Sequence, residues 1–133
     1  MKVFLDTNVL ASAFATRGLC SDVLREVFAS HDLYSSDDVL EELENVLKNK
    51  FGVPHSLIAK IFELLQRESN LVRSQAQVEI SIKDKNDIPI VNAAVTAGVD
   101  VFVTGDKELQ ELGKVGNLEI VSPRRFWELI KSE

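Results

Sequence analysis

Residues 99–106, Val-Asp-Val-Phe-Val-Thr-Gly-Asp, contain the clearest buried strand of the chain. Valine and phenylalanine dominate residues 99–104, and such residues favour the interior of a sheet. Gly105 and Asp106 break the strand, and the residues that follow predict a short helix to about residue 112. We therefore expect this stretch to be a central strand of a sheet covered by helices.

Strands and helices alternate on both sides of this stretch. The hydrophobic pattern predicts strands at 2–5, 32–35 and 118–121, and an alternation of Val78, Ile80 and Ile82 is strand-like. It predicts helices at 8–15, 20–30, 36–49, 55–68, 88–97 and from 123 onward. This order predicts an α/β fold, with a three-layer α/β/α arrangement around a mainly parallel twisted sheet of four to five strands. No repeat or linker divides the chain, so we expect residues 1–133 to form a single domain.

The predicted helix at 55–68 carries an apolar stripe. Its members are Leu57, Ile58, Ile61, Leu64 and Leu65, and we expect them to face inward. Burial in the core is the default interpretation, and a dimer face is the alternative.

Composition excludes several classes of protein. No apolar run approaches the roughly 18 residues that a membrane span requires, so we expect no membrane association. The single cysteine, Cys20, excludes an internal disulfide and fits a reducing cytoplasm. Together with His31 and His55, it is too little for a zinc site of the usual kind. The net charge of −6 argues against a generic phosphate-backbone binder, which is usually basic. It does not exclude a nucleic-acid enzyme whose acids are gathered on metal ions.

Aspartates mark the ends of the predicted strands. Asp6 follows the first strand, Asp106 follows the strand quoted above, and Asp87 begins the helix between them, with Asp84 three residues earlier. Each could simply cap a helix, because aspartate is a favoured N-cap residue. In a parallel sheet, however, Asp6 and Asp106 converge on one edge, where two carboxylates repel each other unless a cation intervenes. Clustered oxygen ligands without Cys or His favour Mg²⁺ or Mn²⁺.

The helix at 36–49 offers one further acid that could reach the same place. At about 100° per residue, Glu42 borders the apolar stripe, whereas Glu41 and Glu44 point to solvent. Asn8 and Thr104 could hydrogen-bond a metal-bound carboxylate. The alternatives are a local turn bond for Asn8 and an ordinary strand residue for Thr104.

Four motifs in this order resemble the PIN domain family. They are Leu-Asp-Thr-Asn at 5–8, Leu-Glu-Glu-Leu at 40–43, Asp-Lys-Asn-Asp-Ile at 84–88 and Val-Thr-Gly-Asp at 103–106. The likeness is to small bacterial and archaeal VapC-like toxins of toxin–antitoxin pairs, and it covers nearly the whole chain. The resemblance implies a metal-dependent ribonuclease whose catalytic and metal-binding acids are Asp6, Glu42, Asp87 and Asp106, with Asn8, Asp84 and Thr104 in support. It also implies an Mg²⁺ or Mn²⁺ cofactor, an antitoxin protein as partner, and a homodimer.

The expected reaction is hydrolysis of RNA, which the resemblance implies leaves a 5′-phosphate and a 3′-hydroxyl. Single-stranded RNA is favoured as substrate, because the metal must reach an unstacked backbone. Candidate phosphate contacts are Arg17, Lys83, Lys85, Lys107, Arg124 and Arg125, although the favoured interpretation of each by itself is an ordinary solvated charge.

A rival enzyme class fits the motifs poorly, and one interpretation outside enzymes stays open. A phosphatase of the haloacid-dehalogenase type requires a second aspartate two residues after the first, where this chain has Asn8. The alternative outside enzymes is a PIN-like scaffold that binds RNA or an antitoxin protein without cutting.

Overall fold

The computed structural model describes residues 1–73 and 87–132. Its elements are β1 (Lys2–Leu5), α1 (Thr7–Ala15), α2 (Leu19–Ser30), β2 (Asp32–Ser36), α3 (Asp37–Asn49), α4 (His55–Glu68), β3 (Asn70–Val72), α5 (Asp87–Thr96), β4 (Val101–Val103), α6 (Lys107–Leu112), β5 (Lys114–Val115), β6 (Leu118–Val121) and α7 (Pro123–Lys131). The described strands form one sheet in the order β3-β2-β1-β4-β6-β5. Every pairing in it is parallel except that between β5 and β6.

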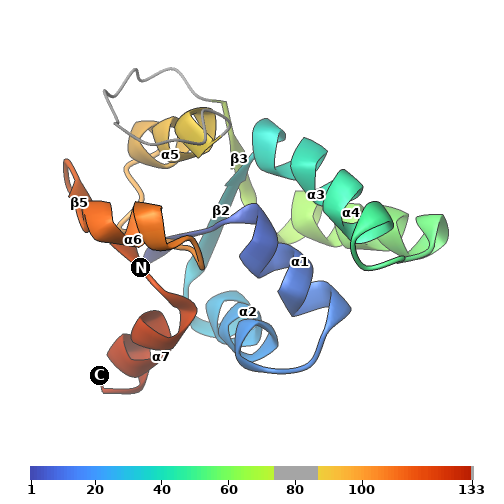
Figure 1. The fold of residues 1–133 in the computed structure, drawn as a ribbon, viewed down its shortest axis with the longest axis horizontal. Coiled ribbons are helices and arrows are strands. Elements are labelled where there is room, and N and C mark those ends of the chain that lie inside the picture. Colours follow the sequence, from blue (N-terminus) through green and yellow to red (C-terminus); the bar gives the residue numbers. More distant parts are fainter. Residues whose placement is uncertain (74–86, 133) are drawn as a thin grey trace.

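Helices cover both faces of this sheet. Helix α5 lies on one side of β2 and α2 on the other (Figure 1), and α7 packs against α2. The predicted α/β/α architecture with a mainly parallel sheet is therefore confirmed. Within the described ranges no helix is both long enough and apolar enough to cross a membrane.

The sheet includes two short strands, β3 and β5, that the pattern did not indicate. The described residues form six strands rather than four to five, because β3 contributes three residues and β5 two. Segments this short show no measurable periodicity, and only their pairing with a neighbouring strand defines them. The strand-like alternation at Val78, Ile80 and Ile82 lies outside the described residues.

The centre of the sheet holds the core of the molecule. Strands β1 and β4 are neighbours, and Phe4 pairs in register with Phe102. Both rings are fully buried and stacked, with centroids 5.4 Å apart. Burial on both faces explains why these strands show continuous apolar runs rather than alternation.

Helices α3 and α4 lie side by side at the end of the molecule opposite β5 (Figure 1). In α4, Ile58, Ile61 and Leu65 are buried as predicted, and Leu64 is half-buried. The expectation for Leu57 is wrong, because its side chain is 46% exposed. One residue before Ile58 is about 100° around the helix, which places Leu57 off the buried stripe.

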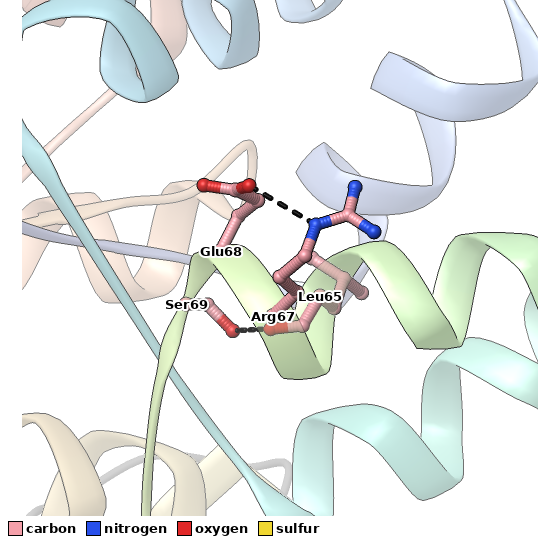
Figure 2. A network of polar contacts seen from close by, with 4 residues as sticks. All are labelled: Leu65, Arg67, Glu68 and Ser69. Atoms are coloured by element: carbon pink, nitrogen blue, oxygen red, sulfur yellow. Dashed lines mark hydrogen bonds and ion pairs between the residues drawn. The ribbon is translucent and has the colours of Figure 1, made fainter.

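The end of α4 fixes the edge of the sheet. The Ser69 hydroxyl donates a hydrogen bond to the Leu65 carbonyl, and Arg67 Nε lies 3.2 Å from Glu68 Oε1 (Figure 2). The Asn70 side-chain amide then donates to the Leu33 carbonyl at 3.3 Å. These contacts turn the chain from the helix directly into β3, beside β2.

Candidate active site

Two polar residues meet where the central strands end. Leu5 of β1 pairs with Val103 of β4, so the next residues, Asp6 and Thr104, lie side by side at the carboxyl edge. The Asp6 N–H donates to the Val103 carbonyl at 3.0 Å and continues the ladder to this point. Asp6 is only 7% exposed and Thr104 is fully buried. Register therefore brings together residues 98 positions apart.

The Thr104 hydroxyl links the two strand-end aspartates. It donates to Asp6 Oδ2 at 2.6 Å and accepts from the Asp106 N–H at 3.0 Å. Thr104 thus hydrogen-bonds the Asp6 carboxylate directly, and its role in supporting a metal site stays a prediction.

The two aspartates differ in their relation to the helices that follow them. Asp106 Oδ1 accepts a hydrogen bond from the Leu109 N–H at 3.1 Å and so caps α6. Asp6 precedes α1, but its side chain makes no capping hydrogen bond. Capping by a side-chain hydrogen bond is therefore present for Asp106 and not for Asp6, although the first N–H groups of α1 act on the Asp6 carboxyl group.

The surroundings of Asp6 oppose its ionisation. Burial raises the pKa of its carboxyl group above the ordinary value of 3.8, and the negative charge of Asp106 raises it further. The hydrogen bond from Thr104 and the backbone N–H groups of Thr7 and Asn8 lower this pKa, but they do not cancel the effect of burial. A carboxylate held beside a second one in this way is a group that a cation would stabilise.

Glu42 reaches the same region from α3. The Thr7 hydroxyl donates to Glu42 Oε2 at 2.9 Å, and Thr7 follows Asp6 directly in the chain. Glu42 is half-buried, whereas Glu41 and Glu44 are exposed, so the helical phase predicted from the sequence is confirmed. Thr7 is the residue that sequence reasoning missed. Its only signal was its place between Asp6 and Asn8 in the first motif.

The other predicted residues lie on neighbouring elements or outside the described residues. Asp87 is the half-buried first residue of α5, and Asn8 is exposed in the first turn of α1. Arg17 and Lys107 are exposed. Asp84, Lys83 and Lys85 lie outside the described residues. The structure thus joins Asp6, Thr104 and Asp106, and it brings Glu42 to Thr7, while a place for Asp87 in the group stays a prediction.

The donor set fits a hard divalent cation. In the part of the chain that the structure describes, no three His, Cys, Asp or Glu side chains stand close enough to hold one metal ion between them. The chemistry of the group nevertheless suits Mg²⁺ or Mn²⁺, because it offers carboxylate oxygens and no sulfur or imidazole. The repulsion of Asp6 by Asp106 is the kind of conflict that a bound cation relieves.

Comparison with known proteins identifies the family. Residues 2–108 match the PIN domain model, and the chain therefore belongs to the PIN domain family. No curated protein matches the chain significantly in sequence.

Solved structures share this fold. One is a chain in the crystal structure of VapBC2 from Rickettsia felis bound to a DNA fragment from the promoter. It is 18% identical to this chain, with a TM-score of 0.67, and the match covers 92% of this chain and 98% of that one. A chain of VapBC-1 from nontypeable Haemophilus influenzae is 18% identical with a TM-score of 0.63, over 93% and 99%. VapC20 from Mycobacterium tuberculosis, a sarcin-ricin loop cleaving toxin, is 15% identical with a TM-score of 0.63, over 88% and 98%. At such identities the likeness establishes the fold.

Proposed function

We propose that this protein is a metal-dependent endoribonuclease and the toxin of a toxin–antitoxin pair. The observation that carries the proposal is the buried Asp6 carboxylate, which Thr104 links to Asp106 at the carboxyl edge of a parallel sheet. Ligands of open α/β sheets bind beyond this edge. The fold shared with VapC20, which cleaves the sarcin-ricin loop, supports RNA as the substrate class.

Asp6, Glu42, Asp87 and Asp106 are the residues that we propose hold the ion, supported by Asn8, Asp84 and Thr104. When bound, an Mg²⁺ or Mn²⁺ ion supplies a water of lowered pKa and stabilises charge that develops on a phosphodiester.

The residues of the chain supply orientation and charge. Hydroxyl groups hold one oxygen of each of two acids: Thr104 binds Asp6 Oδ2, and Thr7 binds Glu42 Oε2. Both carboxylates are therefore oriented before any ligand arrives, which reduces the entropy lost on binding. Lys107 directly follows Asp106 in the chain and is exposed, so it is available to contact an RNA phosphate. The exposed Arg17 is available in the same way.

A cleavage assay with matched variants tests the activity. Native protein should cut single-stranded or structured RNA with Mg²⁺ or Mn²⁺ and stop when EDTA is added. Asp6→Asn should abolish cleavage, whereas Asp32→Asn should leave it unchanged, because Asp32 is exposed at the amino end of β2. Tight RNA binding without cleavage in the native protein would support the non-catalytic scaffold instead.

The partner is tested separately. Two of the similar structures are of VapBC complexes, which supports an antitoxin protein as partner of this chain. Expression alone should arrest growth, and co-expression with the protein of an adjacent reading frame should restore it. We also expect a homodimer, which sedimentation equilibrium would distinguish from a 14.8 kDa monomer.

A further inference from the structure

The carbonyl of Thr104 lies where the sheet cannot supply a hydrogen bond. Between β4 and β6 the Glu119 N–H donates to the Asp100 carbonyl at 3.1 Å, and the Thr104 N–H donates to the Val121 carbonyl at 3.0 Å. Val103 pairs with Val121, so the same parallel pattern would offer the nitrogen of residue 123 to the Thr104 carbonyl. That residue is Pro123, which has no N–H.

Gln110 supplies the missing donor. Its side-chain Nε2 donates to the Thr104 carbonyl at 2.8 Å, and its backbone N–H donates to the Asp106 carbonyl at 3.0 Å. Because Thr104 is fully buried, its carbonyl would otherwise be an unpaired buried acceptor. One residue of α6 thus holds both ends of the turn that carries Asp106.

We propose that Gln110 is a positioning residue, whose amide fixes the Thr104 peptide and so holds the Thr104 hydroxyl between Asp6 and the Asp106 N–H. With its N–H on Val121 and its carbonyl on Gln110, Thr104 is held on both sides of its Cα. Threonine is branched at Cβ and has few χ1 rotamers, so a fixed backbone also fixes the direction of the hydroxyl. This inference rests on the proposed function, because the role of Gln110 is exerted on the proposed metal ligands.

The test is Gln110→Met, which keeps the length of the side chain and removes the donor. Gln66→Met is the matched control, because Gln66 is exposed on α4. Partners of metal ligands typically contribute about 10–100-fold to affinity, and we expect the lower end, about tenfold weaker Mn²⁺ binding by calorimetry. RNA cleavage should lose kcat with little change in KM, and amide exchange at Asp106 should accelerate. The Gln66 variant should match the native protein in all three measurements.

A double-mutant cycle shows whether Gln110 acts through Thr104. In a Thr104→Val background, which lacks the hydroxyl, Gln110→Met should cause no further loss of Mn²⁺ affinity. Equal losses in both backgrounds, or native affinity and native Asp106 exchange in Gln110→Met, would overturn the proposal. A native protein that neither binds Mn²⁺ nor cuts RNA contradicts the proposed function instead. Asp106 exchange then decides the positioning role by itself: faster exchange in Gln110→Met supports it, and unchanged exchange overturns it.

Discussion

Asp6 is a carboxyl group in surroundings that favour its neutral form. Its pKa is raised chiefly by burial and further by Asp106, so the folded state holds this proton more tightly than the unfolded state. The contribution of Asp6 to stability therefore declines as the pH rises from its ordinary pKa of 3.8 through the raised value, and the loss is complete above it. The charge of Asp6 therefore weakens the metal-free fold near neutral pH, which is the cost expected of a residue whose proposed role is to bind a cation.

The first prediction follows from this cost. Without metal, Asp6→Asn should be more stable than the native protein near neutral pH, by about 1 kcal/mol, a usual gain when a functional conflict is relieved. The gain should shrink in acid, where the native carboxyl is protonated as well. Thermal unfolding in EDTA at both pH values measures it. A variant less stable than the native protein at neutral pH would show that the charge of Asp6 supports the fold.

Glu42 and its neighbour Glu41 provide the second prediction. Glu42→Gln should slow RNA cleavage by at least about 100-fold, and Thr7→Val by about tenfold, because the Thr7 hydroxyl orients Glu42. The exposed Glu41 is the control, and Glu41→Gln should stay within about twofold of native, as surface charges usually do. Initial rates at saturating Mn²⁺ give the comparison. Equal losses of cleavage rate in Glu42→Gln and Glu41→Gln would contradict the assignment of Glu42, and not Glu41, to the site.

The sequence predicted the positions of Asp6, Glu42 and Asp106 in the fold better than the contacts around them. Asp6 and Asp106 could be placed at one edge because strands of a parallel sheet end together. Glu42 could be separated from Glu41 because a helix has a fixed angle per residue. The hydrogen bond from Gln110 to Thr104 was not predictable in this way. It depends on the missing N–H of Pro123, the first residue of α7, two positions beyond the end of the neighbouring strand β6.

At the level of elements, two adjacent serines at the end of β2 have opposite roles. Ser36 caps α3, and its Oγ accepts from the Val39 N–H at 3.3 Å. The Oγ of Ser35 is fully buried and has no hydrogen-bond partner in the described structure. Successive strand residues point to opposite faces of a sheet, which is why the neighbours meet such different surroundings.

The third prediction is that the two alanine variants differ in sign. Ser36→Ala should destabilise the protein by about 1 kcal/mol, because it removes the cap of a 13-residue helix. Ser35→Ala should be neutral or slightly stabilising, because a buried hydroxyl without a partner costs free energy. Urea unfolding of both variants gives the difference. A larger loss for Ser35→Ala would mean that its hydroxyl is hydrogen-bonded in solution.

Elements with an apolar pattern of their own were predicted from the sequence, whereas the edge strands β3 and β5 were not. The predicted helix at 55–68 matches α4 in both ends, and the strand at 118–121 matches β6. Strands β3 and β5 were not predicted, because they are defined by pairing with a neighbouring strand and not by an apolar periodicity. Leu57 was misplaced for a related reason, since the apolar pattern gives the centre of a buried stripe more reliably than its border.

At the scale of the whole molecule, the net charge of −6 and the neighbouring aspartates of the site both favour the binding of a cation. Acids gathered at one edge of the sheet repel one another and weaken the compact state when no counter-charge is present. A divalent ion bound there would remove this repulsion only in the folded protein, because the unfolded chain does not hold Asp6 beside Asp106. Metal binding should therefore increase the free energy of unfolding.

The last prediction is a metal-dependent rise in melting temperature. At Mn²⁺ about 100-fold above its dissociation constant, binding to the folded state alone adds about 2.7 kcal/mol. For a chain of this size that corresponds to a rise of several degrees. Asp6→Asn should lose this response even though its metal-free form is the more stable one, whereas Asp32→Asn should keep it. An equal rise in the Asp6 variant would place the ion elsewhere on the acidic surface, because nonspecific counter-ion binding does not depend on one buried carboxylate.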